Sequence, residues 1–508
     1  MTRFYIENFG CRATQADGAA LERQFLERGL ERARMARDAE IVVLNTCTVT
    51  EGADKDARAS IRRLRRANPG CRILVTGCYA QRAPEELAAL PGVTWVVGNS
   101  HKHQAAEIAT GPSSSSNFVP LVQLSGNGLE FPHNRIERDG VEHPEIIVGD
   151  IFAHTELMAA PVFEAANERT RPNLKVQDGC DNRCSFCVIP YVRGQSRSLP
   201  AERVIAEVGT LVEAGYREVV ISGINLGRWG RDLSAVRSSS FALRETQFGS
   251  EVRTASSQRL VDLIRTILAQ TSLEKLRISS VEPMDWSDEL IELVASSPRI
   301  AKHAHVPMQS GSDAVLRRMH RKYRPWHYRE KILKIRNAMS NAAIGADVMV
   351  GFPGETEAEF SETRRMIEEL PFTYLHVFTY STRPGTPAAE QDGQVPVALA
   401  RERNRVLREL AHGKKAAFLS SQVGALVEAI TLQTRGADFT EALTHNYLKA
   451  KIAGQQEANR WVQVRVEGVE GEMLIGRPLE LGNDPGARGR GWVGQRAHNS
   501  NSGVHGIE

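Results

Sequence analysis

Residues 175–190 read KVQDGCDNRCSFCVIP and place Cys180, Cys184 and Cys187 in the spacing Cys-x3-Cys-x2-Cys. Three thiolates can hold three irons of a 4Fe–4S cluster and leave the fourth iron without a protein ligand. Such an open iron can chelate S-adenosylmethionine and give it one electron, which breaks the sulfonium and yields a carbon radical. Cofactors of this kind carry chemistry that side chains cannot supply.

The alternative interpretation is a zinc site or three unrelated thiols. Structural zinc has four ligands, usually arranged as Cys-x2-Cys pairs with a partner pair or histidines. No further cysteine or histidine lies close to 180–187 in the sequence to complete a set of four. The spacing therefore favours an iron–sulfur cluster.

Bulk properties limit the class of protein. A chain of 508 residues is long enough for about three domains, and 41% apolar with 25% charged residues is typical of a soluble globular protein. We expect no membrane partner, because no run approaches the ~20 apolar residues of a membrane helix. We expect a cytoplasmic location, because the N-terminus lacks the pattern of a signal peptide. Seven cysteines then fit metal ligation better than disulfides.

The net charge of +3 is too small to indicate nucleic-acid binding by itself. Basic residues nevertheless cluster at 62–66, 317–324 and 401–415. Such clusters are most often solvated helix faces, and the alternative is contact with phosphates.

Alternating apolar runs and helical periods predict an α/β protein. The pattern within 1–111 predicts a doubly wound parallel sheet wrapped by helices. Six strand signals within 166–400 predict a partial (βα)6 barrel, whose functional residues should follow the strands. Short alternating segments within 411–482 predict a small β-barrel. The expected strands are 4–6, 41–44, 73–75 and 93–97 in the first part; 174–176, 218–221, 275–278, 303–306, 345–350 and 374–378 in the second; and 425–430, 446–451 and 461–466 in the third.

Three segments break this pattern. Residues 112–165, which include four consecutive serines, read as a linker or insertion, and 231–257 reads as a second insertion. The tail 483–508 is rich in Gly, Arg, Asn and Ser, which predicts disorder.

Cys11, Cys47 and Cys78 each close or follow a predicted strand of the first domain. In a parallel α/β sheet the strand ends gather along one edge, where ligands bind. These cysteines either converge on a second cluster or are small buried hydrophobic residues, and their spacing leaves both interpretations open. Cys71 stands where its strand begins, so we expect a structural role for it.

The run from Gln177 to Gly194 resembles the radical S-adenosylmethionine superfamily and, within it, the methylthiotransferases. The segments around Cys11, Cys47 and Cys78 look like the three signatures of that family's N-terminal domain, which binds an auxiliary 4Fe–4S cluster. The resemblance therefore implies two 4Fe–4S clusters and S-adenosylmethionine as cofactors. One departure is Thr14, where the family usually has asparagine.

The resemblance also suggests contacts for S-adenosylmethionine. Phe186 matches the aromatic residue that the superfamily places near the adenine. Gly223 would allow close approach of the backbone, and Glu282 and Gln309 would offer polar groups. The sequence identifies no catalytic side chain, and the clusters are expected to carry the chemistry.

The last predicted barrel resembles a TRAM domain, a tRNA-binding module of this family. Segments 177–180, 279–283 and 319–323 most resemble the branch that adds a methylthio group to C2 of N6-threonylcarbamoyladenosine, just 3′ of the anticodon. The implied partner is the tRNA anticodon stem-loop, bound by a monomer. In the barrel, basic and aromatic residues suit phosphate contact and base stacking, unless the aromatics fill its core. These residues are Tyr447, Lys449, Lys451, Trp461 and Arg465.

Other activities stay open at this point. The substrate could instead be isopentenyladenosine in tRNA or an aspartate of a ribosomal protein. A different class would be a non-enzymatic iron–sulfur or zinc-containing RNA-binding module. The sequence identifies neither the electron donor nor the sulfur donor.

Overall fold

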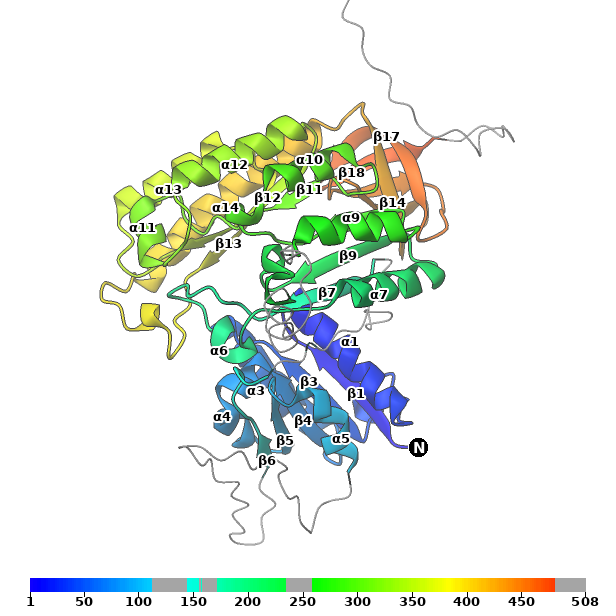
Figure 1. The fold of residues 1–508 in the computed structure, drawn as a ribbon, viewed down its shortest axis with the longest axis vertical. Coiled ribbons are helices and arrows are strands. Elements are labelled where there is room, and N and C mark those ends of the chain that lie inside the picture. Colours follow the sequence, from blue (N-terminus) through cyan, green and yellow to red (C-terminus); the bar gives the residue numbers. More distant parts are fainter. Residues whose placement is uncertain (112–143, 155–156, 158–170, 234–257, 480–508) are drawn as a thin grey trace, which may run out of the picture.

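A computed structural model describes residues 1–111, 144–154, 157, 171–233 and 258–479. It contains an N-terminal sheet, a curved central wall of two sheets, and a closed C-terminal barrel (Figure 1). Of the expected insertion 231–257, residues 234–257 lie outside the described part of the chain. Most of the segment 112–165 and the tail 483–508 also lie outside it. None of the described helices is long and apolar enough to cross a lipid bilayer.

The N-terminal sheet is parallel throughout, in the order β2-β1-β3-β4-β5-β6. Its strands are β1 (Arg3–Asn8), β2 (Glu31–Arg32), β3 (Ile41–Thr46), β4 (Arg72–Gly77), β5 (Val93–Gly98) and β6 (Glu145–Ile147). Its helices are α1 (Arg12–Glu27), α2 (Glu51–Ala67), α3 (Cys78–Arg82), α4 (Pro84–Ala88) and α5 (Ala105–Thr110). Strand β6 falls within 112–165, where no strand is expected from the sequence.

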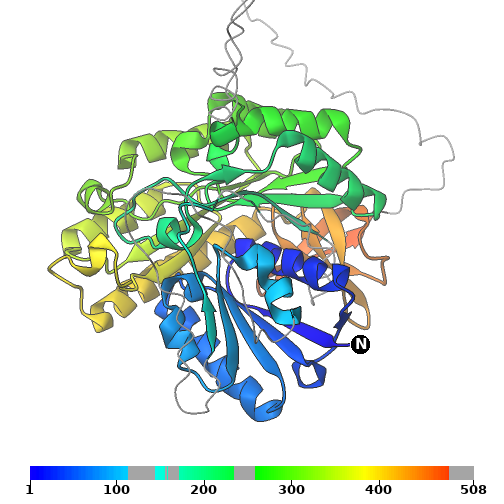
Figure 2. The same cartoon turned by 60° about the horizontal axis from the view of Figure 1, so that its bottom comes forward.

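Helices cover both faces of this sheet, as Figure 2 shows. Helices α1 and α5 pack on one face, and α2, α3 and α4 pack on the other. Strand β3 is buried along its whole length because both its faces are covered, as central strands of parallel sheets are. The predicted doubly wound fold is confirmed.

The central wall contains the six predicted strands in parallel, with the short β8 antiparallel at one edge. Backbone hydrogen bonds join its two sheets, from Leu276 N to Arg299 O at 2.8 Å and from Val281 N to His305 O at 3.1 Å. The partial barrel is therefore confirmed. Its strands are β7 (Asn173–Asp178), β8 (Arg197–Ser198), β9 (Glu218–Gly223), β10 (Lys275–Ile278), β11 (His303–His305), β12 (Ala343–Val350) and β13 (Tyr374–Thr379).

Amphipathic helices pack their apolar faces against this wall and form its large core. These helices are α7 (Ala201–Glu213), α9 (Leu260–Gln270), α10 (Asp288–Ser296), α11 (Asp313–Arg318), α12 (Pro325–Ala338), α13 (Glu357–Glu369) and α14 (Val397–Ser420). The short helix α6 (Ile189–Arg193) packs instead against Cys78 of the N-terminal part. Helix α14 runs without a break past residue 411, where the sequence suggests that the C-terminal barrel starts.

The C-terminal barrel closes in the order β14-β15-β16-β18-β17, which confirms the predicted small β-barrel. Its strands are β14 (Leu426–Arg435), β15 (Phe439–Thr444), β16 (Lys449–Ala453), β17 (Trp461–Glu470) and β18 (Met473–Pro478). Alternate apolar residues of these strands fill its interior.

The turn between β15 and β16 docks this barrel on the central wall. The Tyr447 ring lies 4.6 Å from the ring of His303 and 5.7 Å from that of Tyr374, between centroids. Arg12 of α1 donates a hydrogen bond to the Tyr447 hydroxyl at 3.3 Å. Tyr447 thus joins three parts of the molecule, which corrects the expectation that it stacks on a tRNA base. Trp461 also faces inward, with the ammonium of Lys275 4.9 Å from its ring centre.

A buried charge network joins α1 to the central wall. Asp17 accepts from Lys102 Nζ at 3.0 Å, from Arg193 Nη2 at 2.9 Å, and from Lys175. Asp178 accepts from Lys175 Nζ at 2.7 Å and from Arg193 Nη1 at 3.0 Å. All five side chains are buried. Burial alone would raise the pKa of both carboxyl groups, but the neighbouring cations lower it below the ordinary value.

We expect Asp17→Asn to destabilise the protein strongly, because it leaves three buried cations with one carboxylate. Breaking a buried ion pair from one side costs about 3–5 kcal/mol. Urea unfolding at pH 7, followed by circular dichroism, measures this loss. The pKa of Asp17 is lower in the folded protein than in the unfolded chain, where it is about 4. Its carboxylate therefore stabilises the fold fully at pH values above about 4. The difference between wild type and variant should therefore shrink as the pH falls through the folded pKa.

The matched control is Glu409→Gln, which breaks an exposed pair with Arg405 on α14. It should leave the free energy of unfolding unchanged. An Asp17→Asn variant as stable as this control at pH 7 would contradict the role given to the network.

Candidate functional site

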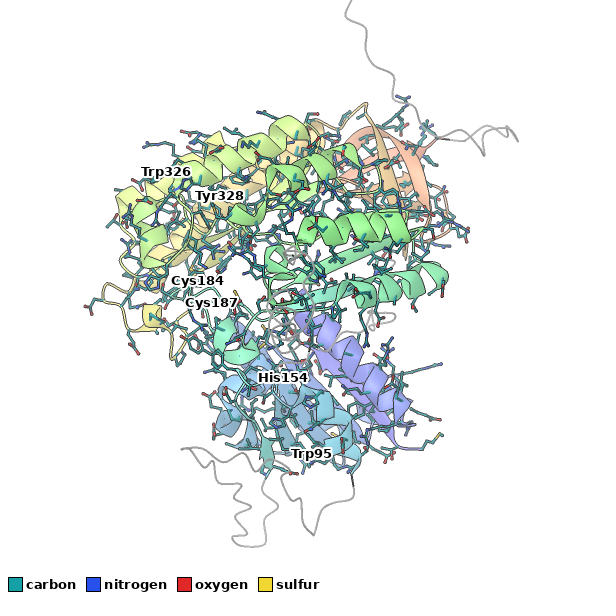
Figure 3. All side chains as sticks on the ribbon, viewed as in Figure 1. Trp95, His154, Cys184, Cys187, Trp326 and Tyr328 are labelled. Carbon is teal, nitrogen blue, oxygen red and sulfur yellow. The ribbon has the colours of Figure 1, made fainter. Side chains whose placement is uncertain are left out.

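The loop between β7 and α6 carries Cys180, Cys184 and Cys187 at the carboxyl end of the first wall strand. Gly179 begins the loop with φ of 72°, and a Cβ there would lie 1.9 Å from the carbonyl oxygen of Gln195. Only glycine fits this turn. Cys180 N donates to Gly194 O at 3.0 Å, so the loop returns to its own start. Figure 3 shows Cys184 and Cys187 between the N-terminal sheet and the wall.

The loop is also fixed across the mouth of the partial barrel. Ser185 donates through N to Met319 O at 3.1 Å and through Oγ to Arg318 O at 2.7 Å. Ala388 N in turn donates to Ser185 O at 2.8 Å. Backbone from α11 and from the segment after β13 therefore positions the cysteines.

N–H groups point at two of the three sulfurs. Cys180 Sγ accepts from Asn182 N at 3.4 Å and from Asn225 Nδ2 at 3.6 Å. Cys184 Sγ accepts from Arg321 Nη1 at 3.2 Å. Hydrogen bonds to cluster sulfurs are among the means by which proteins tune iron–sulfur potentials.

Electrostatics indicate that the three thiols lie close together. Burial raises the pKa of Cys187 to about 12, and the neighbouring Cys184 and Cys180 add to the shift. Burial also raises the pKa of Cys180, with a further contribution from Cys184. Metal ligation requires thiolates, so loading of this site must release protons.

The donor set fits a cluster rather than a single ion. Within the described ranges, no three Cys, His, Asp or Glu side chains group closely enough to hold one metal ion. Thiolates that bind different irons of one cluster stand further apart than ligands of one ion. Three such thiols with N–H donors and an open barrel mouth match a 4Fe–4S cluster with one free iron.

A pocket beside Cys184 opens at this mouth. Glu282, one of the predicted cofactor contacts, lines it and pairs with Arg321. The full lining is Asn182, Cys184, Arg228, Glu282, Met284, His320, Arg321, Lys322 and Tyr323.

Gln309 has two features that suit a ligand contact. Its φ of 61° is unusual for a residue with a side chain. Its buried Oε1 has no hydrogen-bond partner among the described residues. Strained backbone and orphaned polar atoms concentrate at functional sites.

Phe186 and Gly223 occupy different surroundings. Phe186 packs edge-on against Phe352, with ring centroids 6.4 Å apart, in an apolar group at the ends of β12 and β13. A Cβ on Gly223 would lie 2.9 Å from the Cβ of Gln177. The Gln177 side chain spans the loop and bonds Asn225 N and Gly179 O, at 2.7 and 2.8 Å. Gly223 thus makes room for Gln177, and its contact with a cofactor stays a prediction.

Cys11, Cys47 and Cys78 follow the adjacent strands β1, β3 and β4 at one edge of the N-terminal sheet. A Cβ on Gly10 would lie 2.5 Å from the Cβ of Cys47, so glycine lets these two loops meet. Burial raises the pKa of Cys47 to about 12, and Cys78 and then Cys11 add to the shift. Thr14 places its hydroxyl 3.5 Å from Cys11 Sγ, where the family usually has asparagine.

Helix α6 brings the two groups of cysteines together. The helix begins two residues after Cys187. Val188, which precedes the helix, and Val192, within it, pack against Cys78. Asn99 Nδ2 donates to Val192 O at 2.6 Å and to Cys78 Sγ at 3.5 Å. Cys71 is apart from both groups, in the apolar core at the opposite end of β4, about 20 Å away from Cys78 along the strand.

Sequence reasoning missed the partners of the cysteines. Arg321 belongs to a basic cluster that reads as a surface, yet it is buried against Cys184. Asn225 carries a weak signal, since it directly follows a strand end. Asp17 carries no signal in a single sequence, because its contact with Arg193 spans 176 residues. Arg193 lies within the run that resembles the family, but nothing in that run points to its partners.

Comparison with known proteins agrees with this arrangement. Residues 3–98 match a family described as "Uncharacterized protein family UPF0004", and 174–367 match the radical SAM superfamily. The threonylcarbamoyladenosine tRNA methylthiotransferase MtaB of Aquifex aeolicus is 33% identical over 463 residues, which cover 91% of this chain and 99% of that one. MtaB of Bacillus subtilis is 34% identical over 461 residues, which cover 90% of this chain and 92% of that one.

A tRNA-2-methylthio-N(6)-dimethylallyladenosine synthase of Saccharopolyspora erythraea is 32% identical, covering 94% of this chain and 87% of its own. Relatives this similar that span nearly the whole chain show the family. The chain belongs to the radical S-adenosylmethionine methylthiotransferases.

Proposed function

We propose that this chain is a tRNA methylthiotransferase that adds a methylthio group to C2 of N6-threonylcarbamoyladenosine in the anticodon stem-loop. The observation that carries the proposal is the pair of cysteine groups that α6 brings together, since α6 follows Cys187 and packs against Cys78. The names of the MtaB relatives support the choice of base.

Family membership implies S-adenosylmethionine and a 4Fe–4S cluster, which we assign to Cys180, Cys184 and Cys187. We assign a second 4Fe–4S cluster to Cys11, Cys47 and Cys78. When bound, these groups supply radical and sulfur-transfer chemistry that side chains lack.

The chain's own residues orient these groups. Asn225 and Arg321 donate hydrogen bonds to the cysteine sulfurs. Gln309 offers its free amide oxygen, and Glu282 lies beside Cys184, so both can hold polar atoms of S-adenosylmethionine. Phe186 offers an aromatic face to the adenine, and Gly223 keeps the end of β9 open.

The pocket at the barrel mouth favours an anionic substituent. Arg228 and Arg321 each have a carboxylate partner. Lys322 is exposed at the rim and forms no ion pair within the described part of the chain. The threonylcarbamoyl group carries a carboxylate, whereas the dimethylallyl group is neutral and apolar. This charge favours the first base over the second. The exposed Lys449 and Arg465 of the barrel could contact phosphates, which favours tRNA over a ribosomal protein.

We further propose the domain limits 1–111, 166–400 and 411–482 and a cytoplasmic monomer. The segment 112–165 is then a linker apart from β6, which belongs to the N-terminal sheet, and α14 connects the second domain to the third. Electron and sulfur donors are not assigned.

The direct test is mass spectrometry of tRNA nucleosides. Purified, reconstituted enzyme with S-adenosylmethionine and a reductant should convert N6-threonylcarbamoyladenosine in tRNA to its 2-methylthio form. It should leave tRNA that contains isopentenyladenosine unchanged. Conversion of the second tRNA alone would reassign the substrate.

We predict about eight irons per chain after anaerobic reconstitution, from two four-iron clusters. Replacing Cys180, Cys184 and Cys187 together with alanine should leave about four irons and abolish formation of 5′-deoxyadenosine. The triple replacement of Cys11, Cys47 and Cys78 should leave about four and retain that cleavage.

The matched control is Cys71→Ser, which changes a buried cysteine outside both groups. It should keep all the iron and cost about 1–3 kcal/mol of stability, as burial of an unpaired hydroxyl does. Full iron content in either triple variant would refute the ligand assignment.

We also predict that the exposed barrel side chains Lys449 and Arg465 contact tRNA phosphates. Neither forms an ion pair with any residue that the structure describes. Lys449→Glu combined with Arg465→Glu should weaken tRNA binding and flatten its dependence on salt, by about one unit of slope per lost contact. Cleavage of S-adenosylmethionine should not change.

A control with the same change in charge is Arg329→Glu with Arg364→Glu, on the outer helices α12 and α13. Equal loss of tRNA affinity in both double variants would show a general charge effect rather than contact by the barrel.

A further inference from the structure

We propose that Arg193 is a positioning residue for the auxiliary cluster: its Nε–H donates a hydrogen bond to a cluster sulfur, and its charge raises the cluster's reduction potential. This inference rests on the second cluster proposed above. It assigns a function to the buried Nε–H of Arg193, which has no hydrogen-bond partner among the described residues.

The Arg193 side chain is 2% exposed, at the end of α6. Its Nη1 binds both oxygens of Asp178 at 3.0 Å, and its Nη2 binds Asp17 at 2.9 Å. Its Nε has no hydrogen-bond partner among the described residues. A buried donor left without an acceptor is costly, so this N–H calls for a partner beyond the described residues, and a bound cluster would supply one.

The cysteines of the N-terminal sheet lie on this side of α6. Val192, the residue before Arg193, packs against Cys78, and Asn99 bonds both of them. Arg193 also interacts electrostatically with each cysteine of the group. Burial raises the pKa of Cys47, and Arg193 opposes that shift. Cys78 and Cys11 are among the groups that keep the pKa of Arg193 above its ordinary value despite burial.

The charge balance points the same way. Among the described residues, Lys102, Lys175 and Arg193 pair with two carboxylates, Asp17 and Asp178, so this network holds one positive charge in excess. A four-iron cluster with a doubly positive core and three thiolates carries one net negative charge. The bound cluster would therefore neutralise a surplus that is expensive to bury alone.

Both contributions act on the potential in the same direction. Reduction adds an electron to the cluster, and a nearby cation and an N–H donor stabilise that extra negative charge. Their effect is large because the site is buried and weakly screened. Removing the charge and the N–H donor of Arg193 should therefore make the cluster harder to reduce.

The experiment uses the full chain with Cys180, Cys184 and Cys187 changed to alanine, which isolates the auxiliary cluster. Iron content and the midpoint potential, followed by electron paramagnetic resonance, are measured with and without Arg193→Gln. This variant leaves two carboxylates with two lysines, so the network stays balanced. We expect the ratio of reduced to oxidised cluster at a fixed potential to fall at least tenfold, a shift of about 59 mV for one electron.

Two further variants separate the effect of the Nε–H hydrogen bond from the effect of the positive charge and from a general effect of removing a buried arginine. Arg193→Lys keeps the charge but lacks the Nε–H, and it should shift the potential in the same direction by less. Arg403→Gln is the matched control, because Arg403 is also buried, pairs with Glu355 and Glu357, and has a free Nε far from these cysteines. It should leave the potential of the auxiliary cluster unchanged.

A loaded Arg193→Gln protein with the wild-type potential would overturn the inference. If the Arg193→Gln variant fails to bind iron, the potential of the Arg193→Lys variant tests the proposal instead. A wild-type potential in that variant would refute the hydrogen bond from Nε to the cluster. A background protein without iron would instead overturn the second cluster itself, so the two failures are distinguishable.

Discussion

The buried contact of Asp17 with Lys175 and Arg193 is the interaction on which the rest of the site depends. It links α1 of the N-terminal sheet to the strand and helix that flank the loop of Cys180. Charges taken out of water must keep their partners, so α1 cannot shift relative to the wall at small cost. A second buried pair, Arg383 Nη1 with Asp54 Oδ2 at 2.7 Å, holds the two parts together at another point.

This constraint explains how two groups of cysteines from different sheets come to share one region. Each group stands at the carboxyl edge of a parallel sheet, where the topology leaves room for ligands. The two edges meet across α6, which touches Cys78 on one side and follows Cys187 on the other. If Cys180, Cys184 and Cys187 hold one cluster and Cys11, Cys47 and Cys78 hold the other, as proposed, the radical and sulfur-transfer chemistry that they supply would act on the same base. The C-terminal barrel is held to this assembly through Tyr447, so a tRNA bound there has a fixed relation to the mouth of the wall.

The sequence predicted the fold well because its strands are strongly apolar and regularly spaced. Strand β3 reads IVVLNT and is buried throughout, and the six wall strands appear where the pattern expects them. Strand β15 (FTEALT) and strand β18 (MLIGRP) were missed, because acidic, glycine and proline residues interrupt their alternation. Strand β6 is only three residues long and gains its place from pairing with β5, which no local pattern reveals.

The sequence indicates which cysteines gather and not what surrounds them, and their role as cluster ligands stays a prediction. Cys180, Cys184 and Cys187 are close in sequence, and the N-terminal cysteines follow strands, so topology brings each group together. Arg321 and Tyr447 look like surface residues in the sequence, since only tertiary contacts bury the first and dock the second. If the two proposed clusters lie close together at α6, their unpaired spins interact when both clusters are reduced. Electron paramagnetic resonance of the fully reduced enzyme should therefore show spin–spin coupling that disappears when either cysteine group is replaced, whereas two uncoupled signals, or a single signal, would rule out this arrangement.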